Sequence, residues 1–167
     1  GRSLPWREDP TPYHVWISEI MLQQTRIEAV IPYYARFLAE LPTVQDLADC
    51  DDDRLMKLWE GLGYYSRARN LKKAARAVVE NYRGELPETA SELKKLPGIG
   101  DYTAGAVASI AHGQPEPAVD GNVMRVVSRL LCDGGDIADP AVKKRMTASL
   151  REIYPMGNES RCLTEGL

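Results

Sequence analysis

No segment of the chain alternates β-branched and polar residues between paired turns, and this absence leaves helical folds as the main possibility. Signals for helix starts recur instead. Thr11 and the proline after it place an N-cap before a first-turn proline, which predicts a helix to about Gln24. Segments 25–28 and 89–92 both have the spacing of a capping box, and the first predicts a helix to about Glu40.

The spacing of apolar residues predicts the remaining helices. They cover residues 44–48, 53–60, 64–82, 102–111, 121–131 and 140–153. Glycines at positions 61 and 63 break the chain before the third of these segments. A length of 167 residues allows one sizeable core or two small ones. We therefore predict an all-α protein.

The composition is that of an ordinary globular protein, with 44% hydrophobic and 27% charged residues. No apolar stretch approaches the roughly 18 residues of a membrane span, and no secretory leader is visible, which favours an intracellular protein. The three cysteines, Cys50, Cys132 and Cys162, are odd in number and widely separated. This pattern fits neither a disulfide framework nor a metal site, so each is expected to be an ordinary thiol.

The charge balance gives two opposing indications about nucleic acid. A net charge of −3 argues against a nucleic-acid ligand. However, a run without acidic residues contains five basic ones: Arg67, Arg69, Lys72, Lys73 and Arg76. Such a run could form a local basic face that contacts phosphates, although a solvated helix face is the more common outcome.

A glycine-rich hairpin lies between two predicted helices. It consists of Pro97, Gly98, Ile99 and Gly100, and its two glycines allow the backbone to turn tightly and approach a ligand. The helix that follows would present unpaired backbone N–H groups and the positive end of its dipole, which suits a DNA phosphate. An ordinary helix–helix connection with a glycine cap is the alternative.

Downstream of the hairpin, a loop rich in proline leads to Asp120, directly before an apolar helix. A hairpin followed by such a loop and aspartate resembles the helix-hairpin-helix superfamily of DNA glycosylases. The segments 16–25 (WISEIMLQQT) and 61–70 (GLGYYSRARN) are similar to those of its MutY-like adenine glycosylases. The resemblance extends over nearly the whole chain, with the helix-hairpin-helix at about 89–111 and the aspartate-bearing loop at about 112–122. It implies excision of adenine mispaired with 8-oxoguanine or guanine in double-stranded DNA, by a protein that we expect to be a monomer.

Cleavage of an N-glycosidic bond needs a proton for the departing base and negative charge near the sugar, and two carboxyl groups can supply both. Glu19 lies among apolar residues, where burial would raise its pKa and suit a general acid. An outward-facing position on an amphipathic helix is the alternative. The resemblance implies that Glu19 protonates adenine at N7.

Asp120 precedes a helix, so its plainest role is an N-cap that accepts backbone hydrogen bonds. An ionised carboxylate at a cap would also suit a cationic sugar, so the two roles are compatible. The resemblance implies that Asp120 stabilises the oxocarbenium ion, with or without a covalent intermediate, and that Asn122 assists.

Tyr102 distinguishes two kinds of relative. Bifunctional members that resemble endonuclease III carry a lysine after the hairpin, which forms a Schiff base with the sugar and leads to strand cleavage. A phenol cannot form that imine. Tyr102 therefore indicates a monofunctional glycosylase, in which it would hydrogen-bond to the sugar or to Asp120.

The resemblance assigns further residues to the flipped base and to the space that it leaves. Gln24 and Tyr64 match residues that fill or wedge the vacated stack. The adenine pocket is matched by Trp6, Arg7, Leu22 and Glu165. Trp6 and Leu22 could instead be plain core, and Arg7 and Gln24 plain surface.

MutY-like proteins also carry a [4Fe–4S] cluster on four closely spaced cysteines and a C-terminal domain that reads 8-oxoguanine. Neither has a counterpart among residues 1–167, because Cys162 precedes the cluster motif and does not match it. We expect a catalytic region of a longer protein, although a cluster-free variant stays open. Two other functions also stay open: an endonuclease III-like pyrimidine-damage glycosylase, and a non-catalytic helix-hairpin-helix module that only binds DNA. The coexistence of Glu19 and Asp120 argues against the last.

Overall fold

The computed structural model describes residues 3–167, and within them the chain forms helices and no β-strand, as predicted. The helices are α1 (Pro5–Glu8), α2 (Pro12–Leu22), α3 (Ile27–Glu40), α4 (Val44–Asp49), α5 (Asp52–Trp59), α6 (Ser66–Tyr82), α7 (Ala90–Leu93), α8 (Asp101–Ala106), the π-helical η1 (Val107–Ala111), α9 (Gly121–Leu131), α10 (Pro140–Ile153) and α11 (Asn158–Gly166). None of the described helices is both long and apolar enough to cross a bilayer.

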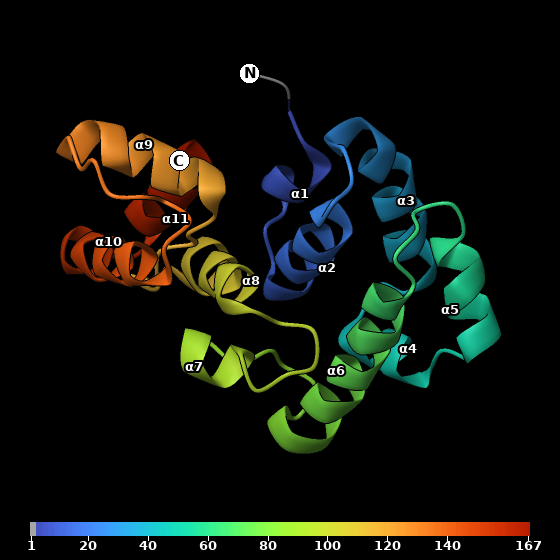
Figure 1. Ribbon diagram of the computed structural model, residues 1–167. Coiled ribbons are helices and arrows are strands. Elements are labelled where there is room, and N and C mark those ends of the chain that lie inside the picture. The colour runs from blue at the N-terminus through green and yellow to red at the C-terminus, as the bar shows by residue number, and fades with distance from the viewer. Residues whose placement is uncertain (1–2) are drawn as a thin grey trace.

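The helices form two groups on either side of α2 and α8 (Figure 1). Helices α3 to α6 lie together on one side, with α4 packed along α6. Helices α9 to α11 lie on the other side, where α11 packs against η1. Helix α2 contacts both α3 and η1 and so joins the two groups.

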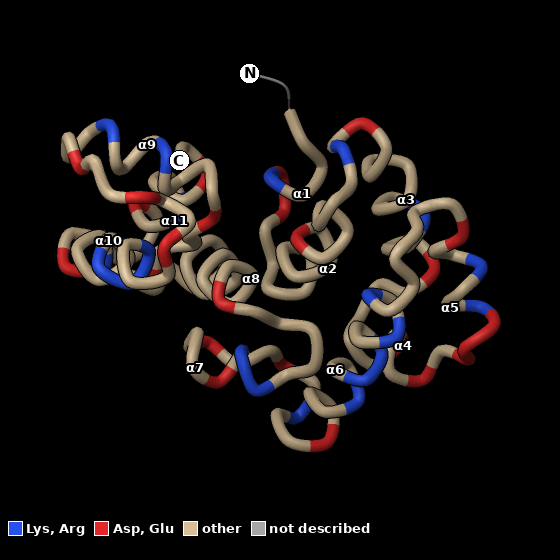
Figure 2. Tube along the Cα trace, in the orientation of Figure 1, with Lys and Arg blue, Asp and Glu red and all other residues tan. Residues whose placement is uncertain are grey.

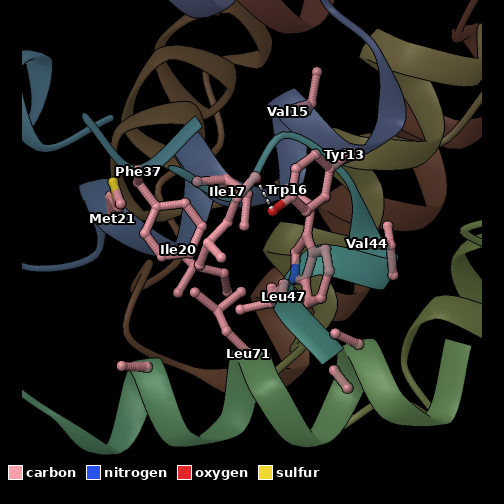
Figure 3. Packing of buried hydrophobic residues seen from close by; sticks show 14 of the residues in the cluster. Tyr13, Val15, Trp16, Ile17, Ile20, Met21, Phe37, Val44, Leu47 and Leu71 are labelled. Atoms are coloured by element: carbon pink, nitrogen blue, oxygen red, sulfur yellow. Dashed lines mark hydrogen bonds between the residues drawn. The ribbon is translucent and has the colours of Figure 1, made fainter. Parts of the chain in front are cut away.

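The larger hydrophobic core surrounds one face of α2 (Figure 3). Trp16 and Ile17 are completely buried there, beside Phe37 of α3 and Leu71 of α6. Burying each such side chain stabilises the fold by about 1.5–3 kcal/mol. This packing fixes the rotation of α2 about its axis and therefore sets the direction in which Glu19 projects.

A second, smaller core joins α9 to α10. It consists of Val119, Val123, Met124, Val127, Val142, Met146 and Leu150. The chain therefore has two cores rather than one, which is one of the two arrangements that its length allowed. Because Val119 and Val123 flank the start of α9, this core holds Asp120 in place.

The predicted helix starts are partly correct. Thr11 caps α2, because its hydroxyl accepts a hydrogen bond of 3.2 Å from the backbone N–H of His14. The capping box predicted at 25–28 is wrong: α3 begins at Ile27, and Arg26 is its N-cap without a side-chain bond. The Thr25 hydroxyl is used elsewhere, since it donates to the Gln23 carbonyl at 3.4 Å and accepts from Arg67.

The capping box predicted at 89–92 is only half formed. The Thr89 hydroxyl accepts from the N–H of Glu92 at 3.4 Å, as expected. The Glu92 carboxylate instead accepts from the Tyr82 hydroxyl at 2.8 Å and pairs with Lys95. A complete capping box joins Thr43 and Asp46 at the start of α4, where none was predicted.

The helix predicted at 102–111 consists of two different parts. Helix α8 ends at Ala106, and the chain continues as the wider π-helical turn η1. Within this turn the Ser109 hydroxyl donates to the Gly105 carbonyl at 2.7 Å and accepts from Thr164 of α11 at 2.8 Å. Helices α1 and α11 were not predicted, because both are short and gain their stability from packing.

Candidate active site

A cavity of about 660 Å³ lies between the two cores. It is lined by residues from both ends of the chain, and they include all the predicted catalytic and pocket residues: Glu19, Tyr102, Asp120, Asn122, Trp6, Arg7, Leu22 and Glu165. A volume of roughly 300–1,000 Å³ is typical of small-molecule pockets and is large enough for a nucleobase. The structure therefore brings these eight residues to one place.

Glu19 lies in α2, and its side chain lines the cavity. Burial, followed by the negative charge of Asp120, raises the pKa of Glu19 from its ordinary value to about 7. A hydrogen bond with Tyr102 and the positive charge of Arg7 act in the opposite direction. Near neutral pH the carboxyl group is therefore partly protonated, which is the state that a general acid requires.

Tyr102 stands in the first turn of α8, with its side chain at the cavity and 38% of its surface exposed. Burial and the charges of Glu19 and Asp120 raise the pKa of Tyr102, so it remains a neutral phenol. Tyr102 hydrogen-bonds to Glu19 rather than to Asp120, which acts on it through its charge, and the predicted contact with the sugar stays a prediction. Tyr102 thereby orients the buried carboxyl group.

Asp120 is the N-cap of α9, as predicted. Its Oδ1 accepts hydrogen bonds from the backbone N–H groups of Asn122 at 2.8 Å and Val123 at 2.9 Å. Both bonds use the same oxygen, so Oδ2 takes no part in the cap. Asn122 lines the cavity as well, and its Oδ1 accepts from Arg125 at 2.9 Å.

One wall of the cavity is built from the two chain ends. Arg7 of α1 donates to the backbone carbonyl of Glu165 in α11 at 3.2 Å. Arg161 closes the contact, because it donates to the Arg7 carbonyl at 2.7 Å and forms an ion pair with Glu165 at 3.3 Å. Trp6 is buried and stacks edge-on against Tyr34 at 5.4 Å, so it belongs to both the core and the cavity wall.

Gln24 and Tyr64 lie outside this cavity, each at the tip of a connection. Both have a left-handed backbone, with φ of 58° and 47°, which is rare for residues other than glycine. The Tyr64 side chain is 61% exposed. An exposed aromatic side chain held in an unusual backbone conformation is suited to contact a ligand rather than to pack.

The hairpin connects α7 to α8 through two glycines with different backbones. Gly98 has φ of +78°, and a Cβ there would lie 2.8 Å from the Cβ of Asn70 on α6. Gly100 has an ordinary negative φ and open space around it, so the tight turn depends on Gly98 alone. Ile99 is buried and anchors the hairpin, which leaves Pro97 and backbone groups exposed.

Only part of the basic run of α6 is available to form the local basic face that its sequence allowed. Arg67 and Lys72 are buried, and Lys72 pairs with Asp52. Arg76 donates to the Ala48 carbonyl at 3.3 Å. Arg69, Lys73 and Arg76 are exposed at the spacing of one helical face, on the helix where Figure 2 shows a row of basic positions. Helical spacing could have indicated that Arg67 is buried, because it shares a face of α6 with the buried Leu71 and Val78.

The described residues do not suit an iron–sulfur cluster. A [4Fe–4S] cluster requires four thiolates, whereas the three cysteines are free and lie on separate elements. Cys50 is buried, and Cys132 and Cys162 are exposed. No group of three or more metal-binding side chains occurs within residues 3–167.

The chain is similar to several DNA glycosylases in sequence. It is 47% identical over 161 residues to human adenine DNA glycosylase, covering 91% of this chain and 30% of that protein. It is 39% identical over 160 residues to adenine DNA glycosylase of Buchnera aphidicola, covering 96% of this chain and 46% of that protein. The chain thus spans less than half the length of these relatives.

Solved structures give the same picture. A thermostable thymine-DNA glycosylase superposes with a TM-score of 0.83 at 27% identity, covering 98% of this chain and 76% of that one. A non-covalent complex of endonuclease III with DNA superposes with a TM-score of 0.74 at 29% identity, covering 92% of this chain and 70% of that one. The family model described as HhH-GPD superfamily base excision DNA repair protein matches residues 17–153. The chain therefore belongs to the HhH-GPD superfamily of base excision DNA repair proteins.

Proposed function

We propose that the chain is the catalytic region of a monofunctional adenine DNA glycosylase. Its substrate would be adenine mispaired with 8-oxoguanine or guanine in double-stranded DNA, and it would act as a monomer. The observation that carries this proposal is the pairing of Glu19 and Asp120 in one cavity, where burial and charge raise the pKa of Glu19 to about 7. Two carboxyl groups in different environments are what acid-assisted cleavage of a glycosidic bond requires.

In the proposed reaction the adenine leaves the duplex and enters the cavity. Glu19 gives its proton to the base as the N-glycosidic bond breaks, and the negative charge of Asp120 stabilises the cationic sugar. Water then adds to C1′ and releases its proton to a carboxylate, which leaves neutral adenine and an abasic strand. Tyr102 keeps Glu19 oriented, and Asn122 supports the sugar side of the cavity.

The DNA contacts would come from three connections. Backbone N–H groups of the hairpin 97–100 would bind a phosphate, which positions the protein without reading sequence. Gln24 and Tyr64 would fill the space that the flipped adenine leaves. Trp6, Arg7, Leu22 and Glu165 would surround the base. The DNA-bound endonuclease III of similar fold supports this assignment.

The rival functions have less support. An endonuclease III-like lyase needs an amine at the sugar, and the described residues that line the cavity include no lysine. A module that only binds DNA would not need Glu19 and Asp120 in one cavity. A DNA substrate places the proposed enzyme inside the cell. A [4Fe–4S] cluster in a longer protein would need cysteines other than those described.

The proposal is tested by single-turnover excision from duplexes that contain A opposite 8-oxoguanine, A opposite G, or T opposite G. We expect the protein to release adenine from the first two and to leave the third intact. Glu19→Gln should abolish release, whereas Glu152→Gln, an exposed change on α10, should not. Thymine release, or full adenine release by Glu19→Gln, would contradict the proposal.

A further inference from the structure

Arg67, in the first turn of α6, is the most extensively bonded side chain near the proposed DNA surface. It is only 9% exposed. Its Nη1 donates to the carbonyls of Ile20, Met21 and Gln23 at 2.9, 3.0 and 2.5 Å. Its Nη2 donates to the carbonyls of Leu62 and Gly63 and to Thr25 Oγ1, at 3.3, 3.2 and 3.3 Å.

The acceptors of Arg67 are unusual for a buried cation. Within the described part of the chain, none of them is a carboxylate, although a buried charge is normally paired with one. Three are carbonyls at the C-terminal end of α2, where the helix dipole is negative. The planar fork of a guanidinium places donors on separate nitrogens and can reach two sets of acceptors, whereas the donors of an ammonium all share one nitrogen.

These two sets of acceptors belong to the two connections that carry Gln24 and Tyr64. One nitrogen of the fork binds the end of α2 just before Gln24, and the other binds the chain just before Tyr64. Arg67 also lies 5.6 Å from the centre of the Tyr64 ring and 5.3 Å from that of Trp59. Both connections hold a non-glycine residue in the left-handed region, which persists only where surrounding contacts enforce it.

We propose that Arg67 is a positioning residue that joins these two connections into one rigid unit, so that Gln24 and Tyr64 enter the duplex together. This inference rests on the proposed function, because it assigns the two tips to the space left by a flipped adenine. Without the fork, each connection relaxes independently. The vacated stack is then filled less often, and the base pair closes again before adenine is cleaved.

The first test uses the protein alone and does not depend on activity. Hydrogen exchange is measured for Arg67→Met, for Arg67→Lys and for the control Lys72→Met, which removes another buried cation of α6. We expect Arg67→Met to accelerate exchange about tenfold or more in both segments 20–25 and 62–66, the loss expected for a charged buried hydrogen-bond donor. Arg67→Lys keeps the positive charge and is included in case Arg67→Met fails to fold. It should not restore slow exchange in both segments. Unchanged exchange, or full restoration by lysine, would overturn the proposal.

The second test separates positioning from a general structural role. Excision is compared for adenine opposite guanine and for adenine opposite an abasic site, where the flipped adenine has no partner base with which to pair again. We expect Arg67→Lys to lower the rate about tenfold or more on the first duplex and less than about threefold on the second, because only in the first can the base pair close again before adenine is cleaved. Equal losses on both duplexes would overturn the proposal.

A double-mutant cycle with Tyr64→Ala completes the design. If Arg67 acts through Tyr64, the two changes together should cost less than the product of their separate effects on the first duplex. The losses of excision rate caused by Lys72→Met and by Tyr64→Ala should multiply when the two changes are combined, since Lys72 pairs with Asp52 and not with Tyr64. Multiplying effects of Arg67→Lys and Tyr64→Ala would contradict the coupling. If wild-type protein excises no adenine at all, the proposed function fails, while the exchange result still decides whether Arg67 holds the two connections.

Discussion

The negative charge of Asp120 raises the pKa of Glu19 across the cavity that both side chains line. Burial is the larger cause, and the charge of Asp120 adds to it. The two residues belong to different cores, Glu19 to the helix packed in the first and Asp120 to the start of the second. The protonation of the proposed acid therefore depends on how the two cores are placed relative to each other.

The proposed acid predicts how excision depends on pH. Because Glu19 with a pKa of about 7 must carry a proton, the single-turnover rate should be constant below that pH and should fall above it, approaching about tenfold per pH unit. Rates measured from pH 5.5 to 9 with saturating enzyme test this expectation. A rate that is flat or rises over this range would exclude Glu19 as the acid.

Tyr102→Phe provides the matched control for the pH profile. The hydrogen bond from Tyr102 lowers the pKa of Glu19, so its removal should move the midpoint of the profile to higher pH. The shape of the profile should not change. A midpoint that moves to lower pH would contradict the hydrogen bond assigned to these two residues.

Glu19→Gln should stabilise the fold at alkaline pH. The pKa of Glu19 is about 7 in the folded protein against an ordinary 4.5, so the folded state binds more protons than the unfolded state between these values. Unfolding free energy is consequently lost as the pH rises from about 4.5 to about 7, and glutamine avoids that loss. Urea unfolding should show a gain of about 2–3 kcal/mol at pH 8 and almost none at pH 4. An equal or lower stability of the variant at pH 8 would refute the buried carboxyl group.

Two substitutions at Asp120 separate its cap from its charge. Asparagine is also a good N-cap, so Asp120→Asn should keep the fold stable and suppress excision. Asp120→Ala removes the hydrogen bonds to Asn122 and Val123 as well, and should cost about 1 kcal/mol of unfolding free energy. Thermal unfolding and single-turnover excision measure the two effects. Retained excision in Asp120→Asn would leave the proposed sugar contact without support.

Substitution by alanine should destabilise the hairpin at Gly98 but not at Gly100. Gly98→Ala places a methyl group against Asn70 in a left-handed backbone and should cost about 1–3 kcal/mol, with weaker binding to every duplex alike. Gly100→Ala meets open space at negative φ and is the matched control. Binding of matched and mispaired duplexes gives the comparison. Loss of affinity in Gly100→Ala alone would place the phosphate contact elsewhere in the hairpin.

Base release should leave the DNA strand intact until alkali is added. Strand cleavage by β-elimination needs an amine at C1′, and the nearest lysines in sequence are held away from the cavity: Lys94 lies 3.2 Å from Asp101, and Lys95 pairs with Glu92. Borohydride should therefore trap little covalent complex. Trapping at the rate of base release would favour the endonuclease III-like alternative.

Local patterns predicted what depends on neighbours in sequence. The start of α2 at Thr11 and the bounds of α9 and α10 follow from caps and apolar spacing, and the structure agrees with them. The apolar surroundings of Glu19 likewise indicated its raised pKa. Each of these features is decided within about one or two helical turns.

Contacts between distant segments could not be read in the same way. Thr25 does not cap α3 because its hydroxyl accepts a hydrogen bond from Arg67, which is distant in sequence. Glu92 fails in its capping box because Tyr82 and Lys95 bind its carboxylate. The sequence likewise did not indicate which of the two hairpin glycines makes a close approach, because Asn70, which lies beside Gly98, belongs to α6.

The π-helical turn Val107–Ala111 holds α11, which contributes to the cavity wall, through packing and the bond between Ser109 and Thr164. A π-helical turn holds about one residue more than an α-helical turn, and each residue of an α-helix rotates the chain by about 100°. Deleting one residue here would restore an ordinary helix and turn everything after it relative to Tyr102. The Ser109 hydroxyl would then no longer meet Thr164, and α11, which brings Glu165 to the cavity, would lose this contact.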